Sequence, residues 1–254
     1  MKPAITLLSL TALILGHAPP AAADTPGFDR PGIAFATAIV PRAAISLEQG
    51  LPDFSRSSDA GVKISFYSAG TNVRIGLFDG AELQLASSLF NQLEIKAGGI
   101  TQTERGAGDT RLGLKVALPS SSDTFSWATL GSVTFDTGTP EFSNNAKQYD
   151  LGVSLALDLT PNITGGFYVN ATHLDGETAL AISPSLSFGL SETVGAYVEA
   201  GYFSNAGEAN SSVAGGGLTW MATPTVQLDA SADFGLNSDS PDVTGGFGVS
   251  IYFQ

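Results

Sequence analysis

The stretch Val226-Gln227-Leu228-Asp229-Ala230-Ser231-Ala232-Asp233-Phe234-Gly235-Leu236 decides the fold. Its apolar residues alternate with polar or small ones, which places one set of side chains on each face of a β-strand. The alternation stops at residues 237–242 and resumes with Phe247, Val249, Ile251 and Phe253 against Gly248, Ser250 and Tyr252. Two neighbouring strands, each with one wholly apolar face, are predicted. A soluble sheet buries such a face against a second layer, whereas a membrane barrel turns it toward lipid.

The N-terminus predicts a secretory signal peptide over residues 1–23. Lys2 supplies the positive charge, Ala4 to Leu15 the apolar run and Ala21-Ala22-Ala23 the cleavage site. The apolar run is too short to span a bilayer, and an uncleaved helical anchor is the alternative. Residues 24–42 are rich in Pro, Gly and Ala without periodicity, so we interpret them as a periplasmic lead-in. Residues 43–254 then form one domain.

Composition excludes several classes of protein. The chain has no Cys, so it can form no disulfide scaffold, thiol nucleophile or Cys-based metal site. A net charge of −13 argues against nucleic acid as a partner. After the signal peptide no apolar run approaches the length of a transmembrane helix. Any membrane span must then be a closed barrel, because open sheet edges cannot face lipid.

Tight turns and longer polar stretches alternate along the chain. Asp79-Gly80 is a hairpin signal, and residues 160–162, 191–193 and 223–225 are similarly short. Pro52–Ala60, Asn91–Gly108 and Asp136–Lys147 are polar and are predicted as loops, although the front half of Asn91–Gly108 could continue the preceding strand through Leu93 and Ile95. Short periplasmic turns with longer extracellular loops are typical of outer-membrane barrels.

One position decides the strand count. The apolar face changes parity across residues 68–72, between Phe66 and Val73. A β-bulge in one long strand would do this, and so would a short turn between two strands. The bulge gives an even count, which bacterial barrels require when both termini are periplasmic. Pro184, inside another predicted strand, implies a bulge or a locally unpaired position.

We therefore predict an all-β chain: a transmembrane antiparallel up-and-down β-barrel of about twelve strands with periplasmic termini. Alternation alone also fits a soluble sandwich. Consistent strand length, alternating connection length and the closing Tyr252-Phe253 favour the barrel, and with the signal peptide they indicate the outer membrane of a Gram-negative cell.

Two segments carry a resemblance to a known family. They are Asn72-Val73-Arg74-Ile75-Gly76-Leu77-Phe78-Asp79-Gly80-Ala81-Glu82-Leu83-Gln84-Leu85 and Gly108-Asp109-Thr110-Arg111-Leu112-Gly113-Leu114-Lys115. With the closing strand, they resemble the outer-membrane transporter family labelled "MetA-pathway of phenol degradation". The resemblance implies an outer-membrane barrel that passes small, often aromatic or hydrophobic molecules. It also implies a C-terminal signal for the barrel-assembly machinery, here Phe247, Val249, Ile251 and Phe253. The last aromatic residue stands one position early, because Gln254 follows it.

Charged residues on the predicted interior face are the candidate site. The most specific set is Arg74, Glu82, Asp109, Arg111 and Lys115. As a constriction they would select or bind a solute, since charged rings set the selectivity of pores. The alternative is that they neutralise one another in salt bridges that fill a narrow lumen. A second, acidic group would form an opposite wall that attracts cations, or would simply face lumen water: Glu199, Asp229 and Asp233, with Asp150 and Asp158.

Catalysis, metals and cofactors are not expected. His173 is the only His after the signal peptide, and no Ser stands in a Gly-x-Ser-x-Gly setting. The predicted function is passive passage of small molecules, hydrophobic or aromatic ones among them. The predicted gate is formed by residues 91–107 and 136–147. The alternative is a closed structural or surface-interaction barrel with no transport role. Expected partners are outer-membrane lipid, the barrel-assembly machinery and such a solute.

Overall fold

The computed structural model describes residues 27–204 and 209–254, so the predicted signal peptide lies outside the described residues. One antiparallel sheet contains the thirteen described strands. They are β1 (Ile45–Asp59), β2 (Val62–Phe78), β3 (Ala81–Ala97), β4 (Ile100–Gly106), β5 (Thr110–Ala117), β6 (Phe125–Phe135), β7 (Gln148–Thr160), β8 (Ile163–Leu174), β9 (Glu177–Gly189), β10 (Val194–Ser204), β11 (Ser211–Thr223), β12 (Val226–Gly235) and β13 (Val243–Phe253). A short 3₁₀ helix, η1 (Pro140–Phe142), lies between β6 and β7.

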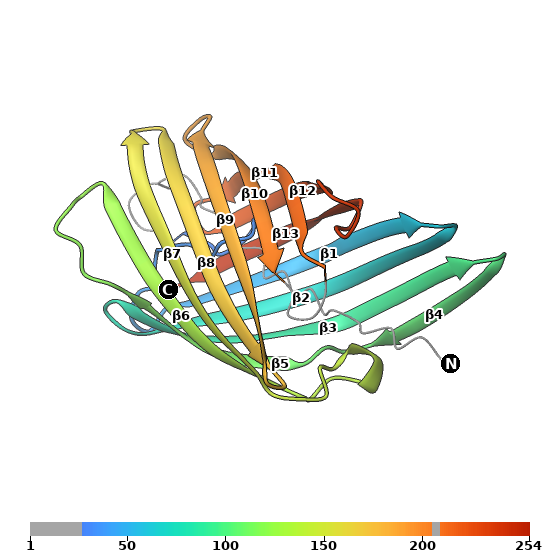
Figure 1. Ribbon diagram of the computed structural model, residues 1–254. Helices are drawn as coiled ribbons and strands as arrows, with labels where there is room; N and C mark the ends of the chain where they lie inside the picture. The colour runs from blue at the N-terminus through green and yellow to red at the C-terminus, as the bar shows by residue number, and fades with distance from the viewer. Residues whose placement is uncertain (1–26, 205–208) are drawn as a thin grey trace.

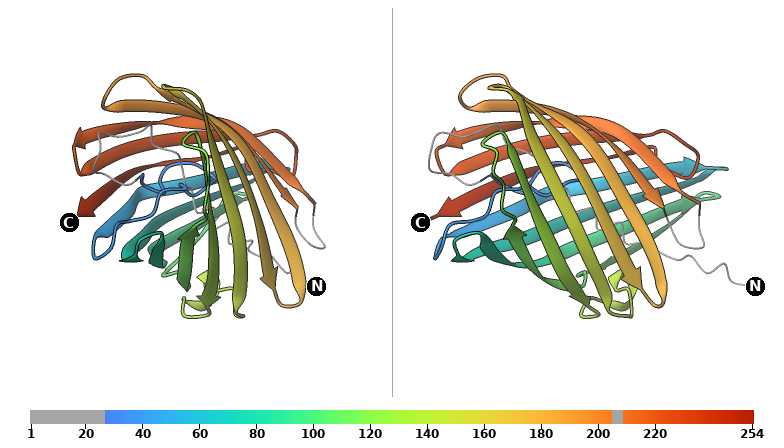
Figure 2. Two further views of the ribbon diagram at one scale, coloured as in Figure 1. Left: turned by 90° about the vertical axis from the view of Figure 1, so that its left-hand side faces the viewer. Right: turned by 60° about the vertical axis from the view of Figure 1, so that its left-hand side comes forward.

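The sheet closes into a barrel, as predicted. β1 pairs with β2 on one side and with β13 on the other. β4 and β5 follow one another along β3, so they form a single position in the wall, which has twelve strands (Figures 1 and 2). Among the described residues, helices with the length and hydropathy of a membrane crossing are absent.

The barrel is apolar outside and polar inside. On β13, Phe247 and Phe253 are 61% and 49% exposed on the outer face, while Gly248, Ser250 and Tyr252 are buried on the inner face. The inner face of the other strands includes buried charged side chains, and the outer face exposes Leu, Val, Phe and Trp. This arrangement is the reverse of a soluble sandwich and is that of a barrel surrounded by lipid.

Residues 62–78 form one strand, β2, as predicted, but the extra residue of the bulge lies in the neighbouring strand. Ala69 pairs with Phe90 and Gly70 with Ser88, so Leu89 of β3 has no partner in β2. The pairing of β9 with β10 skips the position of Pro184, between Ser185 and Ile182. Because Pro has no N–H to donate, this gap in the ladder agrees with the expected locally unpaired position.

Two of the predicted loops are largely wrong. Pro52–Asp59 continues β1. In 91–108, β3 continues through Leu93 and Ile95, which confirms the alternative, and β4 completes a hairpin that was not predicted. Two-residue turns with positive φ connect these strands, Ala60-Gly61 (46° and 82°) and Gly98-Gly99 (57° and 81°), and such turns match the twist of a hairpin. β1–β4 extend beyond the other strands at one end of the barrel (Figure 1). Outside lipid both faces of a strand can be polar, so polarity there did not signal a loop.

The predicted periplasmic lead-in needs a correction. Residues 27–44, here called the plug, lie inside the barrel, where they form the dark-blue segment of Figure 2. Phe28, Phe35 and Val40 are buried against the inner wall. The inner wall carries charged groups that need partners, and the plug supplies them with charges and backbone hydrogen bonds.

Candidate functional site

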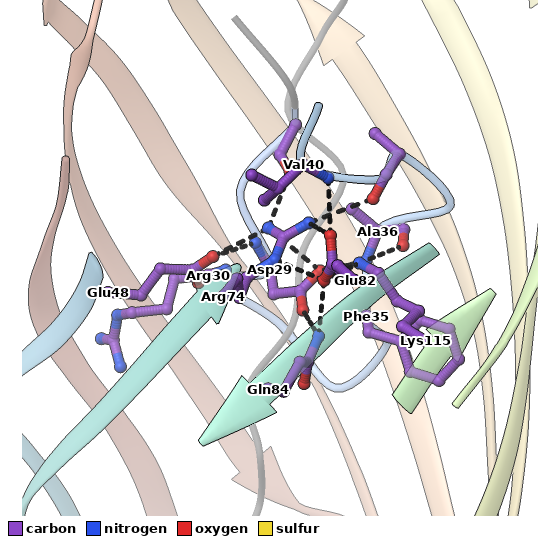
Figure 3. Close-up of polar contacts among 12 residues, drawn as sticks. Asp29, Arg30, Phe35, Ala36, Val40, Glu48, Arg74, Glu82, Gln84 and Lys115 are labelled. Atoms are coloured by element: carbon purple, nitrogen blue, oxygen red, sulfur yellow. Dashed lines mark hydrogen bonds and ion pairs between the residues drawn. The ribbon is translucent and has the colours of Figure 1, made fainter. Parts of the chain in front are cut away.

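Three of the five predicted site residues meet in the lumen. Arg74 of β2 donates from Nε to Glu82 Oε1 at 2.7 Å and from Nη2 to Glu82 Oε2 at 3.0 Å. Lys115 Nζ of β5 lies 3.3 Å from Glu82 Oε1. All three side chains are fully buried. The two cations thus share one carboxylate, and they pair with it rather than line an open ring (Figure 3).

The plug adds a second carboxylate to this group. Asp29 Oδ1 lies 2.8 Å from Lys115 Nζ and 3.4 Å from Arg74 Nη1. Glu48 of β1 accepts from Arg74 Nη1 at 2.9 Å and from the backbone N–H groups of Asp29 and Arg30. We call Asp29, Glu48, Arg74, Glu82 and Lys115 the ionic anchor.

Wall side chains also bind the plug backbone. Glu82 Oε2 accepts from Val40 N at 2.6 Å, and Arg74 donates to the carbonyls of Gly27 and Ala38. Lys115 donates to the carbonyl of Ala36 at 3.1 Å. The anchor therefore satisfies peptide groups of an irregular segment that contains no strand.

Arg30 ties the plug to the adjoining part of the wall, β1 and β12. Its guanidinium donates to both Asp53 oxygens at 3.0 and 2.8 Å and to Asp229 Oδ1 at 3.2 Å. Burial alone would lower the pKa of Arg30, but the hydrogen bonds and charges of Asp53 and Asp229 outweigh it, so the pKa lies above its ordinary value. Arg30 is charged at any physiological pH, and this tie persists.

Of the five predicted lumen carboxylates, Glu199, Asp229 and Asp233 are buried on the inner face, in different settings. Asp158 is exposed at the end of β7, where it accepts from Thr164 Oγ1 at 2.7 Å, and does not face the lumen as predicted. Asp229 binds Arg30, as described, and Glu199 of β10 accepts from the backbone N–H of Ile33 at 2.8 Å. Asp233 of β12 is buried, and its Oδ1 has no hydrogen-bond partner. Two of the three thus hold the plug, and the third presents a free acceptor.

Asp109 is not part of the charged group. Its carboxylate accepts from the backbone N–H groups of Gly138 and Asn144, both at 2.8 Å. Asp109 lies between β4 and β5, and its two partners lie in the connection 136–147. Its contacts are those of a loop anchor rather than of a constriction.

Arg111 also stands apart. It lies on β5 four residues from Lys115, and its Nε and Nη2 are inaccessible to solvent and lack a hydrogen-bond partner. It is the one predicted cation of the lumen for which no ion pair is found among the described residues.

The lumen contains small apolar contacts beside these charges. Phe35 of the plug packs against Ala128, Leu130 and Tyr168, with the Phe35 and Tyr168 rings edge to face at 5.5 Å. Lys115 Nζ lies 5.7 Å from the centre of the Phe35 ring. Phe28 and Val40 pack against Ala44 and Tyr252.

Sequence reasoning missed Asp29, Arg30, Glu48, Asp53 and Gln84 as parts of the site. The available signal was the charged pair Asp29-Arg30 in an otherwise Pro/Gly/Ala-rich segment. His173 lies near the end of β8 with Nδ1 3.1 Å from Thr178 Oγ1. In the described part of the chain, no group of three or more Asp, Glu, His or Cys side chains could hold a metal ion.

The sequence matches a protein-family model over residues 28–253, nearly the whole described chain. The model is described as "Putative MetA-pathway of phenol degradation". The chain belongs to this family. The match begins within the plug, so the family model includes that segment as well as the wall. A comparison with curated proteins finds no match.

Solved structures share the fold at low sequence identity. An outer membrane channel from Pseudomonas putida F1 superposes with a TM-score of 0.70 at 11% identity, over 85% of this chain and 97% of the channel. The NanC porin gives 0.53 at 12% identity, over 83% and 99%. The translocator domain of the autotransporter NalP from Neisseria meningitidis gives 0.52 at 13%, over 82% and 88%. Family and fold together place the chain in the outer membrane.

Proposed function

We propose that the barrel allows passive passage of small molecules, hydrophobic or aromatic ones among them, through a lumen narrowed by the plug. The family description and the similarity to an outer membrane channel support this proposal. The structural matches reported above are channels, a porin and a translocator, and we propose that this chain likewise has no catalytic role.

The observation that carries the proposal is the set of inner-wall polar atoms without a protein partner. Arg111 Nε and Nη2, Asp233 Oδ1 and Glu199 Oε1 belong to it. Polar groups removed from bulk solvent are costly unless water or a solute satisfies them. These atoms come from β5, β10 and β12, so water or solute would reach well-separated parts of the wall. A barrel filled by its own side chains would leave few such groups.

The plug favours the second candidate, a closed barrel with a structural or surface-interaction role. Its backbone and side chains are held from β1, β2, β3, β5, β10 and β12. Passage then requires either a path beside the plug or its displacement. Breaking several buried charge contacts at once is costly, because each leaves an unpaired ion.

Further parts of the proposal concern topology and partners. Both termini would face the periplasm, with β1–β4 extending on the cell surface and the connection 136–147 at the extracellular mouth. The outward row Phe247, Val249, Ile251 and Phe253 would serve the barrel-assembly machinery, and the apolar exterior would contact lipid. The exposure of Phe247 and Phe253 on the outer face supports both partners.

The test is ion conductance of the refolded mature chain in a planar bilayer, beside Arg111→Ala and the double variant Asp29→Ala/Arg30→Ala. Steady wild-type conductance with altered ion preference in Arg111→Ala would support a path beside the plug. Conductance that appears only in the double variant would show that the plug closes the lumen. If none of the three proteins conducts ions although each is shown to be inserted in the bilayer, the barrel is closed to ions. Swelling of liposomes in small neutral aromatic solutes would then decide about uncharged molecules.

A further inference from the structure

Arg111 differs from the other arginines of the lumen. Arg74 contacts Glu82 and Glu48, and Arg30 contacts Asp53 and Asp229. Arg111 forms no ion pair with a described residue, although its Nε and Nη2 are inaccessible to solvent. A buried guanidinium without an acceptor is costly. An exogenous acceptor would remove that cost.

A candidate partner in the wall, Asp150 of β7, is already engaged. It accepts from Thr172 Oγ1 at 2.7 Å, from Gln148 Nε2 at 3.1 and 3.0 Å and from Ser132 Oγ at 3.5 Å. These donors come from β6, β7 and β8. Asp150 thus leaves Nε and Nη2 of Arg111 without a hydrogen bond.

An apolar surface with aromatic rings begins next to Arg111. Gly113, two residues away on the same face of β5, lies against Leu130, because a Cβ at Gly113 would stand 3.0 Å from Leu130 Cδ1. Leu130 packs with Phe35, Ala128 and Tyr168, and the Tyr168 ring lies edge to face on Phe35. The lumen thus places an unpaired cation next to a surface that contains two aromatic rings.

We infer that Arg111 binds the carboxylate of a small aromatic acid whose ring lies against Tyr168 and Phe35. This inference rests on the proposed function and names a substrate class for it. Carboxylate oxygens match the planar fork of a guanidinium and accept two N–H groups at once. A ring packed on Tyr168 and Phe35 would add aromatic contact and burial.

The experiment is isothermal titration calorimetry of the refolded full barrel in detergent. Benzoate is the probe, and benzyl alcohol is its neutral counterpart of similar size. Wild type should bind benzoate at least about tenfold more tightly than benzyl alcohol, the usual worth of one charge-assisted contact. Arg111→Gln should abolish that preference. Arg105→Gln, a matched change on β4 where the side chain donates to Gln92 at an exposed position, should leave it intact.

Several results would overturn the inference. Equal affinity of wild type for benzoate and benzyl alcohol would do so, as would unchanged benzoate binding in a folded Arg111→Gln. If 0.5 M chloride abolishes benzoate binding and wild type binds benzoate no more tightly than acetate, the site binds small anions without recognising the aromatic ring. If Arg111→Gln fails to fold, Arg111→Lys, which keeps the charge and loses the fork, should weaken benzoate binding. Binding at equilibrium is independent of flux, so benzoate preference without passage would refute the proposed function but leave this site.

Discussion

Glu82 is the residue on which the ionic anchor depends. Its two oxygens accept from Arg74, Gln84 and Val40, and Lys115 lies 3.3 Å away. Removing this carboxylate leaves two buried cations short of one counter-charge. Breaking a buried pair in this way usually costs about 3–5 kcal/mol, far more than the net worth of the pair itself.

We therefore expect Glu82→Ala to lower the free energy of unfolding by about 3–5 kcal/mol. Urea titration in detergent micelles, followed by the mobility shift of the folded barrel on electrophoresis, measures it. The control is Glu94→Ala, which removes the surface partner of Lys96 and should cost less than about 1 kcal/mol. Equal losses in the two variants would refute a special role for the buried carboxylate.

Asp109 holds the connection 136–147 rather than the plug, and this role gives a second prediction. Asp109→Ala removes the acceptor of two backbone N–H groups in the connection 136–147. Cleavage of that connection by a protease should become several-fold faster, while the unfolding midpoint of the barrel changes little, because the wall contacts remain. Asp123→Ala, at an exposed position in another connection, should not change the rate. Equal cleavage of Asp109→Ala and wild type would contradict the anchoring role.

For single residues, the sequence predicted which side chains face the lumen but not which groups they contact. Alternation placed Arg74, Glu82, Lys115, Glu199 and Asp229 inside, where the structure has them. Their partners could not be predicted, because Asp29 and Arg30 come from a segment without periodicity. Asp109 lies in the irregular residues 107–109 between β4 and β5, where the two-residue period no longer applies.

Among the elements, the plug and the strand it crosses are closely fitted. Gly76 of β2 donates to Ala44 O and accepts from Ala43 N, and a Cβ at Gly76 would overlap the carbonyl of Pro41. A side chain there cannot be accommodated without moving the plug backbone. The close approach of the plug thus explains why a glycine occupies position 76 in the interior of a long strand.

Gly76→Val should therefore displace the C-terminal end of the plug. We expect greater ion conductance than in wild type, or conductance where wild type is silent, in planar bilayers. Gly131→Val is the control, because a Cβ at Gly131 meets no atom within 4 Å. Unchanged conductance of an inserted Gly76→Val would mean that this end of the plug does not limit passage.

The hairpins show why some elements were missed. Within the lipid zone, the environment forces alternation, and the requirement for an even strand count predicted that residues 62–78 form one strand. In the extension of β1–β4 the outer face is polar too, since Lys63, Ser65 and Tyr67 pair with Lys96, Glu94 and Gln92. Both faces of these strands can then be polar, so alternation of apolar and polar residues does not reveal them. The remaining sequence signal for the β3–β4 hairpin was the turn Gly98-Gly99.

For the molecule as a whole, the structure implies that the outer face of the wall meets lipid along one part and water along another. Leu114 of β5 is 46% exposed and Ile100 of β4 is 74% exposed, yet we place only Leu114 in the lipid zone. Solvent exposure alone would rank Ile100 as the more accessible. The surrounding medium, not the exposed fraction, should decide what a charge costs at each position.

Leu114→Arg should cost about 2–4 kcal/mol of folding free energy in phospholipid vesicles, the range for a cation near the middle of a bilayer. Ile100→Arg, beyond the lipid zone, should cost close to nothing, because its side chain is already in water. Reversible unfolding by guanidinium in vesicles, followed by tryptophan fluorescence, compares the two. Similar costs at both positions would contradict a membrane boundary between β4 and the middle of β5. A larger cost at Ile100 would place the protruding hairpin, rather than the wall, in lipid.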